Sequence, residues 1–197
     1  MLKLSENPPI LPPDVVTLSQ LSGKWWVAHT KSRFEKVFAW DLLHRKIGYF
    51  LPMISKIKIS GGKKRHVVLP LFSSYVFFCG NDDDRYWAMT TNRLCRTIPV
   101  VDQAGLIREL TAIEKAILGQ AKLDLYPFAV AGSRCRITSG VFKGLEGTII
   151  DCGKQTRIVL SVKILSQGAV MEIDADLLEP IPENVLVQRE LDTTLFC

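Results

Sequence analysis

Along the first 120 residues, segments with the apolar pattern of β-strands alternate with segments whose apolar residues recur at helical spacing. Aromatic and β-branched residues of the kind found in strands fill three segments: 24–31, 49–59 and 70–80. Apolar residues at helical spacing occupy two others, one beginning at Ser32 and one over 102–118. Between them, "DDDRYWAMTTN" begins with acids that favour a helix N-terminus, and "LCRTIPVV" predicts a short strand. The resulting order, β-α-β-β-α-β-α, predicts a sheet with helices on at least one face.

Two short motifs refine this order. Ser32 and Glu35 have the spacing of a capping box, which predicts the start of the first helix. The segment "SGGKKRH" (60–66) combines two glycines with three consecutive basic residues. It predicts a solvated turn at the tip of a hairpin.

The periodicity changes after Leu118. Residues 119–129 have no clear period and predict a linker. From Gly132 onward, Gly, Lys or Gln turns separate five short β-prone segments: "SRCRITS", "GTIID", "TRIVLSVKI", "AVMEID" and "DLLEP". Several short strands within about 50 residues predict a small barrel.

Positive charge is concentrated in the first part of the chain. Of the 197 residues, 1–120 hold 17 Lys or Arg against 10 Asp or Glu, whereas 121–197 hold 8 against 10. This asymmetry predicts that the first part meets a polyanion and that the second does not depend on one. A solvated basic surface accounts for the same excess, and composition alone does not separate the two.

Composition disfavours several classes of protein. The five cysteines are odd in number and include no CxxC pair, so the chain lacks the pattern of a disulfide framework or zinc site, and reduced thiols in the cytoplasm are expected. Apolar runs fall short of the roughly 18 residues needed to span a bilayer. The prolines near the N-terminus argue against a signal peptide, so residues 1–22 are predicted to be a flexible leader. No nucleophile–base pair or metal-like His spacing is present, so we expect no catalytic residue, cofactor or metal.

The stretch "RCRITSGVFKGLEGTII" (134–150) contains three glycines between two apolar segments. Its spacing matches neither the GxxxxGK[ST] loop nor the GxGxxG fingerprint, which disfavours phosphate binding. The glycines allow bends instead: Gly140 and Gly144 can take positive φ, and Phe142 between them would fold back onto the barrel. Gly147 allows the next strand to bend sharply.

This stretch resembles a KOW motif, the signature of small SH3-like barrels in ribosomal proteins and transcription elongation factors. The matching positions are Gly132, Arg134, Arg136, Gly140, Phe142, Gly144 and Gly147. Upstream, "WWVAHTK", "IGYFLP" and "PLFSSYVFF" resemble, in order and spacing, the N-terminal domain of the bacterial NusG transcription factors. Ser73-Ser74 replaces the usual Pro-Gly, so the chain looks more like a specialised, operon-specific paralogue of the RfaH type than the housekeeping factor.

The resemblance implies an α+β fold class. An N-terminal α/β sandwich with a mainly antiparallel sheet flanked by helices would precede a small SH3-like β-barrel. We predict five segments: a flexible leader (1–22), a NusG-type N-terminal domain (23–118), a linker (119–129), a KOW β-barrel (130–181) and a C-terminal tail (182–197). In some paralogues this barrel refolds as helices. Here the β-prone segment "TRIVLSVKI" favours a stable barrel.

In this family the N-terminal domain docks on the clamp of RNA polymerase through an apolar sheet surface. The matching residues here are Phe72, Tyr75 and Phe77. By the period of two, Tyr75 and Phe77 share one strand face, while Val76 and Phe78 share the other. A strand that is apolar on both faces needs two covers: helices would supply one and the polymerase the other. The alternative, in which all these residues are core, stays open.

The resemblance also implies contact with the non-template DNA strand from the first helix and nearby loops. The polar and basic candidates are Lys31, Arg33, Lys36, His44, Arg45, Asn92, Arg93 and Arg96. Arg33, Lys36 and His44 fall on a similar helical azimuth, away from the apolar face. A solvated basic face is the alternative.

The implied function is transcription elongation or antitermination by a monomeric, cytoplasmic protein that is not an enzyme and does not bind membranes. Its KOW domain would recruit a second partner, either a small-subunit ribosomal protein or the termination factor Rho. A ribosome-associated KOW-type RNA-binding protein is the alternative, but it predicts a basic barrel, and the barrel region here is slightly acidic. An enzyme would need convergent ionisable residues, which the sequence does not show.

Overall fold

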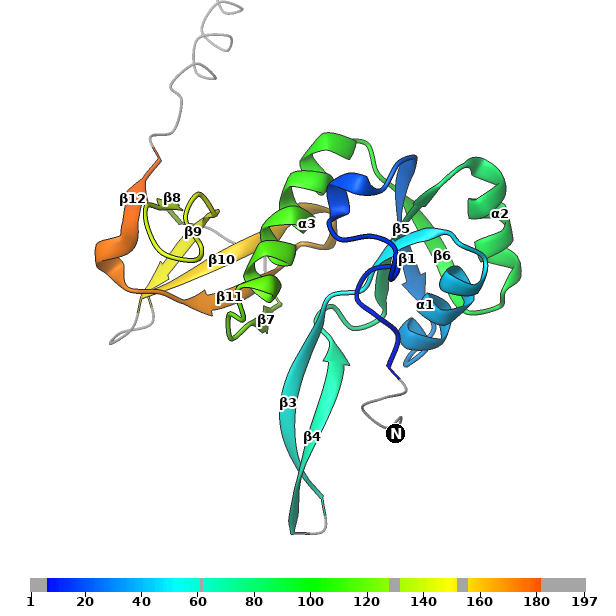
Figure 1. Cartoon of the computed structure of the whole chain (residues 1–197), viewed down its shortest axis with the longest axis horizontal. Helices are drawn as coiled ribbons and strands as arrows, with labels where there is room; N and C mark the ends of the chain where they lie inside the picture. The colour runs from blue at the N-terminus through cyan, green and yellow to red at the C-terminus, as the bar shows by residue number, and fades with distance from the viewer. Residues whose placement is uncertain (1–6, 61, 128–131, 152–155, 182–197) are drawn as a thin grey trace, which may run out of the picture.

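The computed structural model describes residues 7–60, 62–127, 132–151 and 156–181. They form two antiparallel sheets, a separate two-stranded hairpin and three α-helices. Figure 1 shows α3 (Gln103–Leu118) between the two sheets, with the hairpin projecting away from both. The mixed α/β architecture expected from the alternating periods is confirmed.

The first sheet has the strand order β2 (Gly48–Phe50), β5 (Tyr75–Gly80), β1 (Lys24–Thr30) and β6 (Leu94–Pro99), all antiparallel. Helices α1 (Glu35–His44) and α2 (Asp82–Thr90) contribute to the core on one face, around Trp26 and Phe78. The other face carries Trp25 and Phe77 and shares a core with α3. Both faces are apolar because the central strands are buried on both sides.

The hairpin consists of β3 (Met53–Ser60) and β4 (Lys63–Pro70). The segment 49–59, predicted as one strand, is therefore split between β2 and β3, and Pro52 lies in the break. The prediction of a turn over 60–66 is also wrong in part, because its basic residues begin β4. The ladder with β3 extends the strand to the tip of the hairpin.

Two helix ends test the capping signals. Asn81 caps α2, where its side chain accepts the N–H of Asp84 at 2.8 Å, as the acidic run predicts. The capping box at Ser32 is wrong: α1 begins at Glu35, and Phe34 is its N-cap residue. Glu35 is buried and accepts the N–H of Ser74 at 2.6 Å instead, so a tertiary contact replaces the local cap.

The second sheet has the order β12 (Leu178–Pro180), β8 (Arg134–Ile137), β9 (Glu146–Asp151), β10 (Thr156–Val162), β11 (Gln167–Glu172) and β7 (Asp124–Tyr126). The five strands expected after Gly132 are therefore present. Among the described residues the two outer strands, β12 and β7, are not paired with each other, so closure into an SH3-like barrel stays a prediction. β7 lies inside 119–129, where a linker is predicted. These residues form a strand because they pair with β11. The domain boundaries themselves stay predictions.

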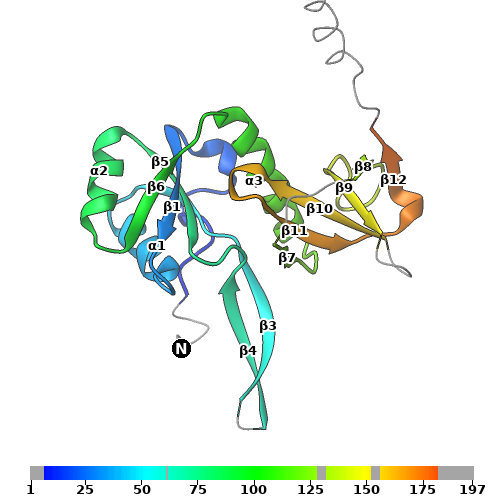
Figure 2. The ribbon, with the colours of Figure 1, turned by 180° about the vertical axis from the view of Figure 1, so that it is seen from behind.

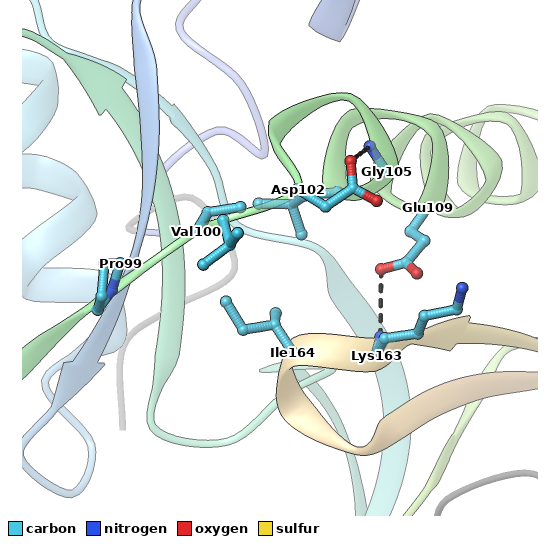
Figure 3. Close-up of a pocket in the computed structure, with 9 residues that line it drawn as sticks. Pro99, Val100, Asp102, Gly105, Glu109, Lys163 and Ile164 are labelled. Carbon is cyan, nitrogen blue, oxygen red and sulfur yellow. Dashed lines mark hydrogen bonds between the residues drawn. The ribbon is translucent and has the colours of Figure 1, made fainter. Parts of the chain in front are cut away.

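The second sheet packs against α3, the last helix before it in the chain. Leu110 of α3 and Ile158 of β10 belong to one continuous apolar cluster. The carboxylate of Glu109 accepts the backbone N–H of Lys163 at 3.1 Å, and Figure 3 shows this bond beside a small pocket between the two parts. Burial raises the pKa of Glu109, and the bond from Lys163 opposes that rise.

The segment before the first strand is folded over residues 7–22, which corrects the prediction of a flexible leader for this stretch. The N–H of Leu51 donates to the carbonyl of Ile10 at 2.9 Å, and the hydroxyl of Tyr49 donates to the carbonyl of Pro9 at 3.0 Å. Leu18, in a short 3-10 turn, is 2% exposed, and its N–H donates to the buried Glu114 at 2.8 Å. Prolines exclude a helix here but not an extended strap that bonds to the domain.

Replacing Leu18 with alanine is expected to lower the free energy of unfolding by roughly 2–3 kcal/mol, because a buried leucine leaves a cavity when it is truncated. Urea denaturation followed by circular dichroism measures this change. Val16→Ala is the matched control, because Val16 is 73% exposed and its loss should change stability by less than about 0.5 kcal/mol. Equal effects of the two substitutions would show that the strap is not part of the folded domain.

Candidate functional site

The register of β5 against β1 decides which aromatic residues share a face. Tyr75 pairs with His29, Phe77 with Val27 and Cys79 with Trp25. Tyr75 and Phe77 therefore lie on the α3 side of the first sheet, while Val76 and Phe78 lie on the α1 side. The two-faced strand expected from the sequence is confirmed.

Phe72 and Phe77 are core residues in this structure. Their exposed fractions are 1% and 0%, and their rings meet edge to face at 6.1 Å between centroids. Phe50 packs on Phe77 at 6.4 Å. The expectation of three exposed docking aromatics is therefore wrong for these two, because α3 and the N-terminal strap cover much of the face that a partner would have covered.

Tyr75 alone of the three keeps a partly exposed side chain. Its ring stacks on the ring of His29, with 5.2 Å between the centroids. His29 of β1 in turn lies opposite the exposed Arg96 of β6. We call Tyr75, His29 and Arg96 the cross-strand row. It places an aromatic pair beside a cation at one end of the sheet, the kind of mixed surface that forms interface hot spots.

His29 was missed as a site residue, although the alternation of 24–31 carries the signal that finds it. Residues two apart on a strand point to one face, so His29 belongs with Trp25 and Val27. Only the pairing with Tyr75 brings it to the site, and that pairing depends on register. Behind the row, Ser74 has a φ of 67°, and Glu35 holds its N–H, which fixes the chain just before Tyr75.

The first helix and the loop after α2 lie together, as the DNA-contact hypothesis requires. Lys31 donates to Asn92 at 2.6 Å, and Arg93 forms an ion pair with Asp41 of α1 at 3.0 Å. Arg93 also lies over the ring of Phe34, at 5.5 Å from its centroid. These contacts bring together three of the predicted residues and their neighbours, but the ion pair with Asp41 also neutralises one of the predicted cations.

Lys36 does not belong to this exposed group. Its ammonium donates to the side chain of Asn7 and to the carbonyl of Val68, both at 2.5 Å. Burial lowers its pKa, and the nearby Glu35 carboxylate only partly offsets that effect. Arg33 precedes the helix, with a φ of 66°, so the azimuth shared by Arg33, Lys36 and His44 is also wrong.

A shallow pocket of about 310 Å³ lies where α1 ends beside α2. Asp41, His44, Arg45 and Trp87 line it. The guanidinium of Arg45 lies 4.8 Å from the centroid of Trp87, and His44 stacks on Trp40 at 6.0 Å. Trp87 was not predicted as a site residue, because nothing in its own segment indicates a cation on its ring.

The KOW-like positions have structural roles that the structure makes visible. Gly140 and Gly144 have φ of 78° and 84°, so the bends expected at both glycines are confirmed. Arg134 and Arg136 both form ion pairs with Glu146, at 3.0 and 2.6 Å. The remaining positions show close packing: Gly132, with a φ of 152°, and Gly147 lie close to neighbouring backbone, and Phe142 lies against Gly119.

Other kinds of site were sought across the described ranges. No group of three or more His, Cys, Asp or Glu residues there is arranged to hold a metal ion. Within the same ranges, none of the helices combines the length and apolarity needed to cross a bilayer.

A comparison with family models decides which family the sheet and its site resemble. The model described as "Transcription termination factor nusG" matches residues 23–116. Residues 23–116 therefore match a NusG-family domain. The match begins one residue before β1 and ends within α3, so this NusG domain includes the whole cross-strand row and the β3–β4 hairpin. The second sheet lies outside it.

Solved structures add little to this result. One described as "Crystal Structure of MjSpt4:Spt5 complex conformation B" is 15% identical, and the similarity covers 81% of this chain and 98% of that chain. Its TM-score is 0.24, which is too low to support an argument about this fold. No curated protein matches the chain significantly.

Proposed function

We propose that this chain is a non-enzymatic transcription elongation or antitermination factor that binds RNA polymerase through its NusG domain. The observation that carries the proposal is the NusG family match over residues 23–116. As described above, the resemblance to the NusG family implies that the polymerase clamp is the partner of this domain. Clamp binding that favours the closed state raises the cost of the open, paused state, so pausing and termination are suppressed by a shift in population.

The docking surface that we propose is centred on the cross-strand row. Tyr75 and His29 present a stacked aromatic pair that is only partly covered, whereas Phe72 and Phe77 support it from the core. Arg96 adds an exposed cation at the same end of the sheet. Non-template DNA would approach from the neighbouring surface, where the exposed Arg33, His44 and Arg45 remain candidates.

The second sheet would act as a KOW domain that recruits a second partner, a small-subunit ribosomal protein or Rho. Two partners held by one chain make the second contact effectively intramolecular, so modest affinity is enough. The ion pairs of Arg134 and Arg136 with Glu146 partly neutralise the basic side chains of β8, which supports a protein partner over RNA. Departures such as Ser73-Ser74 support a specialised, RfaH-type role. The proposed protein is a cytoplasmic monomer.

Capture of purified core RNA polymerase by the immobilised full-length chain tests this proposal. Polymerase should be retained at about 0.15 M salt, where nonspecific attraction between distant surface charges is largely screened. A basic protein of similar pI, near 9.0, serves as the control bait. Retention no greater than with that bait would contradict the proposal.

A further inference from the structure

The β3–β4 hairpin forms an arm that extends away from the NusG domain, and Figures 1 and 2 show it projecting in both views. Its strands are paired along all eight residues, from Met53 opposite Pro70 to Ser60 opposite Lys63. At about 3.3 Å per residue, the ribbon is roughly 26 Å long. Ile54 and Val67 are buried nearer its base, whereas Lys63 to His66 at its outer end are exposed.

The arm carries the whole net charge of the protein. Residues 53–70 contain five Lys or Arg and no Asp or Glu, whereas the rest of the chain contains 20 of each. A two-stranded ribbon without acidic residues repels itself, because its cations lie within a Debye length of one another. This concentration therefore favours an anionic partner over a purely structural role.

The outermost cations are free to meet that partner. Lys63, Lys64 and Arg65 are exposed, and within the described ranges no acidic side chain forms an ion pair with them. By contrast Lys56, nearer the base, forms an ion pair with Asp124 of β7 at 2.8 Å. The charge at the base thus joins the arm to the second sheet, and the charge at the tip does not stabilise the fold.

The register places these cations on both sides of the ribbon. Lys63 lies opposite Ser60, and Arg65 opposite Lys58, so both lie on one face. Lys64 lies opposite Ile59 and therefore on the other face. Ile57 and Ile59, which are 59% and 72% exposed, share that second face. The tip is therefore a narrow basic ribbon with a small apolar patch.

We propose that this arm binds double-stranded B-form DNA by entering the major groove. The groove is about 12 Å wide and admits a two-stranded β-ribbon, and phosphates form both of its walls. The face that carries Ile57 and Ile59 would lie toward the groove floor, where its isoleucines can contact thymine methyl groups. The long, flexible side chains of Lys63, Lys64 and Arg65 can reach the phosphates of the two walls from a ribbon this narrow. Duplex RNA does not fit this description, because its major groove is too deep and narrow for such access. The site is separate from the cross-strand row and from the candidates on α1.

Fluorescence anisotropy with a labelled DNA duplex of about 20 base pairs and the full-length chain tests the proposal. The variant K63Q/K64Q/R65Q should bind on the order of 10-fold more weakly near 0.1 M salt. The slope of log affinity against log salt should fall by about 2–3, since each lost phosphate contact contributes about 0.9. Because the three side chains are exposed, the thermal unfolding midpoint should not change.

The matched control is R108Q/K122Q/K143Q, which removes the same charge from exposed positions outside the arm. Its affinity should fall by no more than about 2-fold, since distant surface charges are screened at this salt. Equal losses in the two triple variants would overturn the proposal and show that only net charge matters. Binding of a duplex RNA of the same length as tightly as DNA would also overturn it. Loss of DNA binding with unchanged polymerase capture would support the arm as an independent site.

Discussion

Replacing Phe77 with alanine is expected to lower the free energy of unfolding by about 3–5 kcal/mol, the range measured for large aromatic residues removed from cores. The side chain is fully buried, and it contacts the rings of Phe72 and Phe50. It also lies in the cluster that joins the first sheet to α3, so the cavity would lie where several elements meet. Urea denaturation, followed by circular dichroism and tryptophan fluorescence, measures the change.

Tyr86→Ala is the matched control for this experiment. Tyr86 is an aromatic residue on α2 with 74% of its surface exposed, so its loss should change stability by less than about 0.5 kcal/mol. A loss below about 1 kcal/mol for Phe77→Ala would contradict the core assignment. Such a result would instead support the interpretation of Phe77 as a docking residue that RNA polymerase covers.

Replacing Tyr75 with alanine is expected to weaken polymerase binding by about 30-fold or more, equivalent to the roughly 2 kcal/mol that marks a hot spot. Folding should be affected much less, because the ring is partly exposed and its stacking on His29 contributes only about 0.5–1.5 kcal/mol. A titration of immobilised core polymerase with the full-length variant measures the affinity. Chemical denaturation of the same preparation measures stability.

The same exposed tyrosine, Tyr86, serves as the binding control, because α2 packs on the face of the first sheet opposite to the one that carries Tyr75. Tyr86→Ala should bind polymerase as the unchanged chain does. Two results would contradict the docking proposal for Tyr75: an affinity equal to that of the unchanged chain, or unfolding of the Tyr75→Ala variant. The second would place Tyr75 with Phe72 and Phe77 as a structural residue.

Local patterns predicted the elements of this protein well. The 3.6-residue period of 102–118 predicts α3, and the acidic run at 82–84 marks the start of α2. The five short segments after Gly132 predict β8 to β12. Each of these signals lies within a few residues, so the chain does not need distant contacts to express it.

Signals that compete with distant contacts failed. The capping box at Ser32 does not form, because the buried carboxylate of Glu35 instead accepts a hydrogen bond from the N–H of Ser74, nearly forty residues away. The leader looked flexible because no local pattern shows that the chain reaches Leu51 and Glu114. The turn over 60–66 extended into a strand because β3 offers a complete ladder of partners.

The sequence by itself determined that β5 is apolar on both faces, that the first part is basic and that the chain resembles the NusG family. Those properties follow from residue type, period and order. Only the tertiary structure decided that α3 and the strap bury Phe72 and Phe77 and leave Tyr75 partly exposed beside His29 and Arg96. It also decided that the positive charge is carried on a projecting arm. The physical reason is that exposure depends on which surfaces pack together, and packing joins segments that no local pattern connects.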